Sequence, residues 1–191
     1  AGVFLIARFA PAFSDVPGWR ITLVALGVAT MLLGGWVALR QTDLKLLLAY
    51  GTVSQLGFLV VIAGYGTRDA LLGAGALLLA HALFKSCLFL IVGIIDQQTG
   101  TRDLRTLSGL GRRMPVVAVV AALALASMAG IPPLFGFVAK EAVLHGLLVS
   151  GASDAGAGDP VAIAAVIGVV LGSTLTVAYG LRFFWGAFAT K

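Results

Sequence analysis

The chain has 191 residues, of which 60% are hydrophobic and only 11% charged, and its mean hydropathy is +1.05. Soluble domains carry about a quarter charged residues, so this composition excludes a soluble globular fold. The formal net charge is +5, but the basic residues stand at the ends of apolar segments and form no patch with interleaved aromatic side chains. This arrangement argues against nucleic-acid binding and indicates membrane topology instead.

Five apolar segments are long enough to cross a bilayer, whose hydrocarbon core of roughly 30 Å requires about 20 helical residues. The sequence therefore predicts an all-α, polytopic integral membrane protein with five transmembrane helices. We interpret the apolar residues 1–8, which no basic signal-peptide region precedes, as the tail of a preceding helix cut from a longer protein. The predicted spans are about 21–39, 46–64, 70–95, 116–149 and 161–181.

The fourth apolar segment is interrupted by Pro132 and Pro133. A straight helix over 116–149 would be roughly 50 Å long, which exceeds one simple crossing. Two consecutive prolines remove two backbone donors and clash with the preceding turn. We therefore expect one span made of two half-helices, with irregular backbone at membrane depth that protein or a hydrated cavity must satisfy.

Basic residues in the loops divide unevenly between the two sides of the membrane. One side collects three and the other eight, so the positive-inside rule predicts that the second side, with loops about 40–45 and 96–115 and the C-terminus, is cytoplasmic. The two remaining basic residues, Lys85 and Lys140, lie inside predicted spans, where topology does not explain them. The three basic residues of the first side are Arg8, Arg20 and Arg68. The eight basic residues of the predicted cytoplasmic side are Arg40, Lys45, Arg102, Arg105, Arg112, Arg113, Arg182 and Lys191.

Lys85 lies near the middle of the third predicted span. A lysine at this depth costs at least about 2.5 kcal/mol unless it faces water, a partner or a cavity. Burial disfavours the ammonium, which turns a fixed cation into a group that takes up and releases protons. His81 precedes it by four residues on the same helix face, where an imidazole can pass a proton along. The alternative for His81 is a core histidine bonded to a neighbouring carbonyl.

Lys140 follows Pro133 by seven residues, inside the second half-helix. An ionisable residue beside a broken membrane helix points to an ion path. The alternative is a lysine whose aliphatic stem reaches the membrane interface. The neighbouring Glu141 is a candidate supporting residue of the path. Because it points about 100° away on the helix, it does not automatically form an ion pair with Lys140.

Several weaker polar candidates accompany these residues. Ser54 and Gln55 in the second span either hold water beside the path or bridge helices, which is the commoner use, and Thr174 and Tyr179 in the fifth span have the same two alternatives. The single cysteine, Cys87, forms neither a disulfide framework nor a metal cluster by itself. The sequence shows no nucleophile with its base and no phosphate-binding glycine motif, so we expect no metal, no cofactor and no enzymatic activity.

Three blocks of the sequence resemble the antiporter-like subunits that complex I shares with the Mrp cation/proton antiporters. In chain order these blocks are 42–57, 81–85 and 128–141. Two further segments, 93–103 and 173–188, are more similar to the A subunit of the Mrp antiporters than to the L subunit of complex I.

The resemblance implies two inverted five-helix repeats, each with one broken helix, of which this chain would hold the second. It also implies that Lys85 belongs to a central hydrophilic axis and that Lys140 is the key lysine of the second broken helix. Family members often carry a further histidine one turn before His81, where this chain has Leu77. The first repeat, with its coupled glutamate and lysine, is not part of this sequence.

These observations predict a proton-translocating subunit of a multisubunit Na⁺/H⁺ antiporter in a bacterial plasma membrane. Protons would pass along water and the side chains of His81, Lys85 and Lys140, whose charges bias one another. The expected partners are other subunits of the antiporter, membrane lipid, and H⁺ and Na⁺ as transported ions. Two alternatives stay open: a proton-pumping L-type subunit of a complex I NADH dehydrogenase, and a membrane scaffold whose lysines pair with acids of other subunits.

Overall fold

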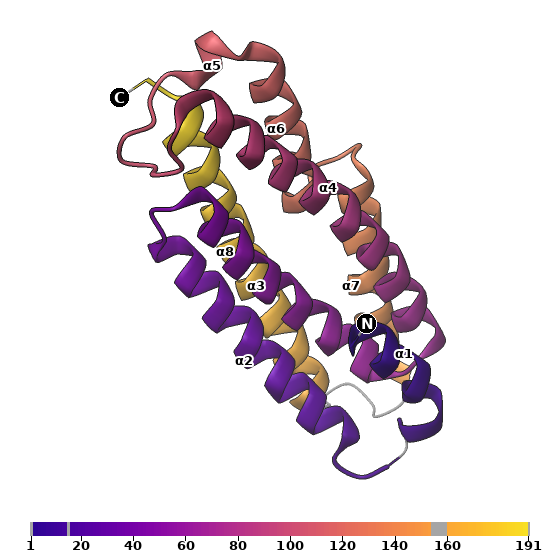
Figure 1. Ribbon diagram of the computed structural model, residues 1–191. Coiled ribbons are helices and arrows are strands. Elements are labelled where there is room, and N and C mark those ends of the chain that lie inside the picture. The colour runs from indigo at the N-terminus through magenta and orange to yellow at the C-terminus, as the bar shows by residue number, and fades with distance from the viewer. Residues whose placement is uncertain (1, 15, 154–159, 191) are drawn as a thin grey trace.

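The computed structural model describes residues 2–14, 16–153 and 160–190. Over these residues the regular structure is helical, apart from one isolated antiparallel bridge between Asp43 and Asp103. The predicted all-α fold is therefore confirmed (Figure 1). Residues 154–159 of the loop before the last span and Lys191, one of the eight basic residues on the predicted cytoplasmic side, lie outside the described residues.

Four of the helices are long and apolar enough to cross a membrane. They are α2 (Trp19–Arg40), α3 (Leu44–Tyr65), α4 (Arg68–Thr99) and α8 (Pro160–Phe188). Each extends beyond its predicted span: in α2, α3 and α4 most of the added residues are polar, whereas α8 continues through the largely apolar residues 182–188. The chain's first helix, α1 (Gly2–Phe13), is shorter and packs against α3.

Polar side chains and glycines define where these helices begin and end. The Asp43 carboxylate accepts hydrogen bonds from the backbone N–H groups of Lys45 and Leu46 at the start of α3. This is the standard use of an N-cap aspartate. Gly66 and Gly100 close α3 and α4 in the left-handed region, at φ 77° and 71°. Only glycine adopts that conformation without strain, so each of the two helices stops one residue before it.

The predicted break in the fourth span is confirmed. Helix α6 (Pro115–Ala129) ends at Gly130, and α7 (Phe135–Ser153) begins after the two prolines. The two half-helices follow one another along α4 (Figure 1). They also overlap at their ends, because the Gly136 N–H donates to Ser127 Oγ at 3.3 Å, and a Cβ at Gly136 would collide with the Ser127 carbonyl.

The helices pack through small residues and expose large apolar ones. A Cβ at Gly27 would lie 2.9 Å from the Gly57 carbonyl, and one at Gly57 would lie 2.6 Å from the Met31 nitrogen, so α2 and α3 approach backbone to backbone. Such contacts are typical of membrane helices. Large apolar side chains cover the outside, with Leu90 and Trp185 each 70% exposed. An outer surface of this kind fits lipid and not water.

Polar contacts tie several helix ends together at one end of the bundle. Arg102 lies 3.5 Å from the Asp43 carboxylate and 3.8 Å from that of Asp96. The Arg182 guanidinium donates to the Gln41 carbonyl at 3.2 Å. The loop after α4, which includes the short helix α5 (Leu110–Arg113), therefore docks beside the α2–α3 turn.

Candidate functional site

Lys85 is enclosed between α3, α4 and α8, and its side chain is only 4% exposed. Its ammonium donates to the Leu48 carbonyl at 3.1 Å and lies 5.7 Å from the centre of the Tyr179 ring. Gly51 makes this approach possible, since a Cβ there would lie 3.1 Å from Lys85 Nζ and 2.9 Å from Tyr179 Cε2. A carbonyl and an aromatic face are both favourable neighbours for a desolvated cation.

Lys140 reaches from α7 back across the break to the end of α6. Its ammonium donates to the Ala129 carbonyl at 3.0 Å, and a Cβ at Gly130 would lie 2.9 Å from Lys140 Cδ. The last carbonyls of a helix lack partners within it and carry the negative end of its dipole. The half-buried Lys140 therefore places its side-chain nitrogen at the C-terminal end of the first half-helix.

Within the described residues, neither lysine has a carboxylate partner. The ion pairs of this part of the chain involve Arg102 and Arg105 at the loop end of the bundle. Glu141 is exposed on the outer face of α7, although it is adjacent to Lys140 in sequence. The printed hydrogen-bond acceptors of both lysines are thus uncharged backbone carbonyls.

His81 lies one turn before Lys85 on the same face of α4, 8% exposed. Its ring packs edge to face against Phe84, with 5.5 Å between ring centres. Its Nδ1 atom is buried, and no hydrogen-bond partner for it occurs among the described residues. A core histidine would be expected to bond to a neighbouring carbonyl. The described residues show no such bond for Nδ1.

Ser54 and Gln55 both bridge helices, and both are buried. Ser54 Oγ donates to the Met31 carbonyl of α2 at 2.8 Å. Gln55 Nε2 donates to Thr176 Oγ1 of α8 at 2.9 Å, so the two neighbouring side chains hold α3 against different helices. The Gln55 Oε1 atom is buried and has no partner among the described residues. Gln55 thus joins α3 to α8 through Nε2, while its Oε1 atom can accept a further hydrogen bond.

The sequence did not single out Gly51, Thr176 or Met128, which lie around the same point. Tyr179 Oη is 3.4 Å from the Gly51 carbonyl and 3.8 Å from Met128 Sδ, where α3, α6 and α8 meet. Thr176 stands three residues before Tyr179, on the same face of α8. This i, i+3 spacing of two polar side chains was a usable signal, whereas Gly51 and Met128 stood in the sequence only as members of the resembling blocks 42–57 and 128–141.

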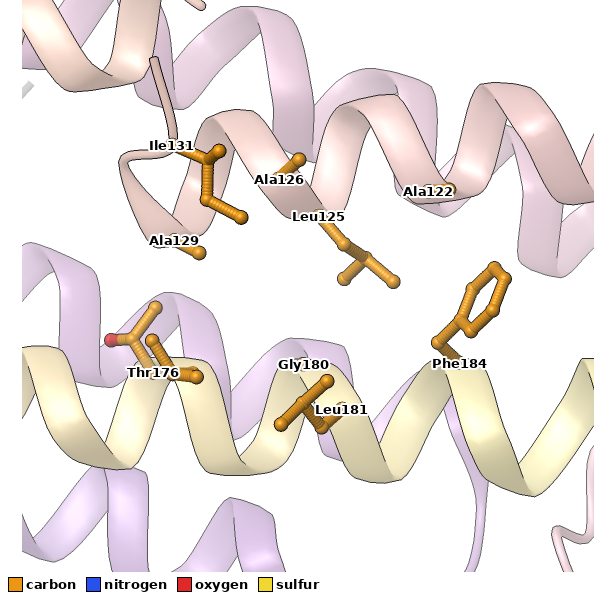
Figure 2. Close-up of a pocket in the computed structure, with 10 residues that line it drawn as sticks. Ala122, Leu125, Ala126, Ala129, Ile131, Thr176, Gly180, Leu181 and Phe184 are labelled. Carbon is orange, nitrogen blue, oxygen red and sulfur yellow. The ribbon is translucent and has the colours of Figure 1, made fainter.

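An apolar groove of about 200 Å³ lies between α6 and α8, close to the break. Figure 2 shows Leu125, Ala129 and Ile131 facing Phe184 and Thr176 across it. Thr176 is the polar member of its described lining, and neither Lys85 nor Lys140 borders it. The groove is therefore suited to an apolar occupant and is separate from the two lysines.

The helices and the two lysines define a polytopic membrane protein with ionisable side chains enclosed in its bundle. Residues 1–155 match the family described as NADH:quinone oxidoreductase/Mrp antiporter, transmembrane. The chain belongs to this family.

Curated relatives of the chain are named as antiporter subunits. The A subunit of the Na⁺/H⁺ antiporter of Alkalihalophilus pseudofirmus is 39% identical over 205 residues, which cover 100% of this chain and 26% of the relative. The A/B subunit of a probable K⁺/H⁺ antiporter of Rhizobium meliloti is 39% identical over 188 residues, covering 98% of this chain and 18% of the relative. The chain thus spans about a quarter or less of the length of these relatives.

Two solved structures share the fold. The Mrp complex from a Dietzia species contains a chain that is 46% identical and superposes with a TM-score of 0.87, over 96% of this chain and 20% of the other. Respiratory complex I from Thermus thermophilus with bound NADH contains one that is 29% identical with a TM-score of 0.81, over 100% of this chain and 39% of the other.

Proposed function

We propose that this chain is the proton-conducting second repeat of the A subunit of a multisubunit Na⁺/H⁺ antiporter. In this proposal protons move along water and the side chains of His81, Lys85 and Lys140, and their movement drives the exit of a monovalent cation. The whole subunit, with its first repeat and its partner subunits, performs the exchange. Ser54 and Gln55 support the path by fixing α3 against its neighbours, and Glu141 stands at its outer edge.

The observation that carries the proposal is the pair of lysines held without acids. Lys85 bonds to the Leu48 carbonyl and Lys140 to the Ala129 carbonyl, and each lies in a membrane helix. Leaving a lysine there is costly, so the arrangement needs a functional reason. Reversible protonation is one, since a lysine held by neutral groups changes its charge without breaking an ion pair.

A proton-pumping subunit of complex I is the nearest alternative, because a chain of respiratory complex I shares the fold. The identity of 46% and TM-score of 0.87 against the Mrp complex exceed the 29% and 0.81 against complex I. The curated relatives described above are likewise named as antiporter subunits. These comparisons favour the antiporter.

A purely structural scaffold is the alternative from a different class. It requires acids of other subunits to reach both lysines. Lys85 is only 4% exposed and is covered by Tyr179, so a carboxylate from outside would first have to displace that ring. The packing around Lys85 therefore argues against the scaffold.

The proposal includes an orientation in a bacterial plasma membrane. The polar end that joins the α2–α3 turn to the loop after α4 would face the cytoplasm. That end contains Arg102, Arg105 and Arg182, whereas the opposite loops contain few basic residues. The positive-inside rule supports this direction.

The test replaces Lys85 or Lys140 by Ala in the full-length subunit, assembled with its partner subunits in membrane vesicles. We expect each variant to assemble and to lose cation-driven proton movement, measured with a pH-sensitive dye. Lys45, an exposed lysine at the start of α3, provides the matched control, because Lys45→Ala should transport normally. Full transport by an assembled Lys85→Ala or Lys140→Ala complex would exclude the proposed path.

A further inference from the structure

Tyr179 occupies the point where α3, α6 and α8 meet, and its side chain is fully buried. Its hydroxyl lies 3.4 Å from the Gly51 carbonyl of α3 and 3.8 Å from Met128 Sδ of α6. Both contacts are longer than a good hydroxyl hydrogen bond, and a thioether is a weak acceptor. The hydroxyl is therefore in position but only loosely held, so it is free to exchange partners.

Lys85 is close to this tyrosine directly, and Lys140 is bonded to the residue that follows Met128, a contact of the hydroxyl. The Lys85 ammonium is 5.7 Å from the centre of its ring. Met128 touches the hydroxyl, and the next residue, Ala129, accepts the hydrogen bond of the Lys140 ammonium at 3.0 Å. Contacts thus lead from Lys85 through Tyr179 to Met128, and the next residue in the sequence supplies the carbonyl that holds Lys140.

Thr176 and Gln55 are the polar side chains near the Tyr179 hydroxyl among the described residues. Gln55 Nε2 donates to Thr176 Oγ1 at 2.9 Å, and Thr176 lies three residues before Tyr179 on the same helix. The Gln55 Oε1 atom is buried, with the residue 2% exposed, and lacks a partner among the described residues. A buried acceptor of this kind normally bonds to a donor or to ordered water. The other side chains here, Met128 and Leu125, are apolar and offer a proton no strong acceptor.

We propose that the Tyr179 hydroxyl is the relay through which protons pass between Lys85 and Lys140, an inference that rests on the proposed function. The hydroxyl oxygen accepts a proton donated by way of water from the Lys85 ammonium, forming a new O–H bond. The original O–H bond breaks as its proton moves through water to the neutral Lys140 amine. Tyr179 is neutral before and after, and nothing is oxidised or reduced. Gln55 Oε1 holds a water of this path beside the hydroxyl.

The test is Tyr179→Phe in the full-length subunit within its assembled complex, because phenylalanine keeps the ring beside Lys85 and removes only the hydroxyl. The matched control is Tyr50→Phe, the same change at a tyrosine that is 38% exposed on α3. We expect the maximal rate of proton movement to fall about tenfold or more in Tyr179→Phe, with the half-saturating cation concentration and the thermal stability unchanged, and less than about twofold in the control.

A second variant covers the case in which Tyr179→Phe does not assemble. Tyr179→His keeps a donor and an acceptor at this place, so we expect it to retain transport within about tenfold of the unmodified complex. An assembled Tyr179→Phe complex at the normal rate would overturn the relay. So would an unassembled Phe variant together with an assembled but inactive His variant, because a donor and an acceptor at this place would then not carry the proton.

Lys85→Ala separates this inference from the proposed function. If Lys85→Ala abolishes transport and Tyr179→Phe does not, only the relay is wrong. If Lys85→Ala transports normally, the proposed function is wrong whatever Tyr179→Phe shows. If the proposed function and the relay are both right, the double variant Lys85→Ala/Tyr179→Phe should transport no more slowly than Lys85→Ala alone, because both residues belong to one path.

Discussion

The ammonium groups of Lys85 and Lys140 each bond to one backbone carbonyl, at 3.1 and 3.0 Å. A carbonyl offers a partial negative charge, whereas a carboxylate offers a full one and would fix the proton on the lysine. Both carbonyls belong to helix backbones, so their positions do not depend on side-chain rotamers. The two ammonium groups thus have fixed locations and no full negative charge as hydrogen-bond partner among the described residues, which is what the proposed proton transfer requires.

Lys85→Met tests whether the buried charge serves function or stability. Methionine fills a similar volume and removes a cation that is costly to desolvate, so the assembled protein should melt at an equal or higher temperature while proton transport is lost. Lys45→Met, the same change at an exposed lysine, should affect neither measurement. A lower melting temperature for Lys85→Met than for Lys45→Met would show that Lys85 is needed to hold the bundle together.

Gly51→Ala tests the close approach of α3 to the site. The new methyl would lie 2.9 Å from Tyr179 Cε2 and 3.1 Å from Lys85 Nζ, so one of these groups must shift. We expect slower proton transport in vesicles with assembly retained. Gly75→Ala is the control, since a Cβ at Gly75 meets nothing within 4 Å and alanine favours the helix. Equal transport rates in the two variants would show that the site tolerates displacement.

At the scale of elements, the break between α6 and α7 creates the Lys140 site. Gly130 ends α6 in the left-handed region at φ 87°, and its N–H bonds to the Ala126 and Ser127 carbonyls. The Ala129 carbonyl is then available to Lys140. A continuous helix would use that carbonyl for its own backbone bond, so the break is what lets a side chain reach it.

Gly136→Ala probes the overlap of the two half-helices. Its Cβ would collide with the Ser127 carbonyl, which belongs to backbone and cannot turn aside like a side chain. We expect a loss of stability of about 1–3 kcal/mol and a lower melting temperature. Gly93→Ala, a change in α4 where a Cβ has open space, should leave melting unchanged or raise it. Similar melting of both variants would mean that α6 and α7 separate at little cost.

The sequence predicted the elements better than the contacts between them. Span positions follow from apolar length, and the break follows from Pro132 and Pro133, because both signals are local. The partners of the lysines are not local: Leu48 is 37 residues before Lys85 on another helix, and Ala129 is 11 residues before Lys140 across the break. Apolar spans of similar composition carry little information about which helices become neighbours, so these carbonyls could not be predicted.

At the scale of the whole molecule, the fold places its polar contacts at one end and its buried lysines within the bundle. The Arg102 and Arg182 contacts join the α2–α3 turn to the loop after α4 and the end of α8. The helices α2, α3 and α4 then cross the membrane three times between the α1–α2 loop and the loop after α4. These two loops must therefore lie on opposite sides if each helix is a full crossing.

Single cysteines at Val16 and Gln98, in a Cys87→Ala background, test that orientation. Both positions are exposed, Val16 before α2 and Gln98 in the last turn of α4. With a membrane-impermeant maleimide, Val16→Cys should label in intact cells, and Gln98→Cys should label in inside-out vesicles only. The unmodified Cys87→Ala protein controls for background labelling. The reverse pattern would invert the proposed orientation, and labelling of both positions from one side would contradict three crossings between them.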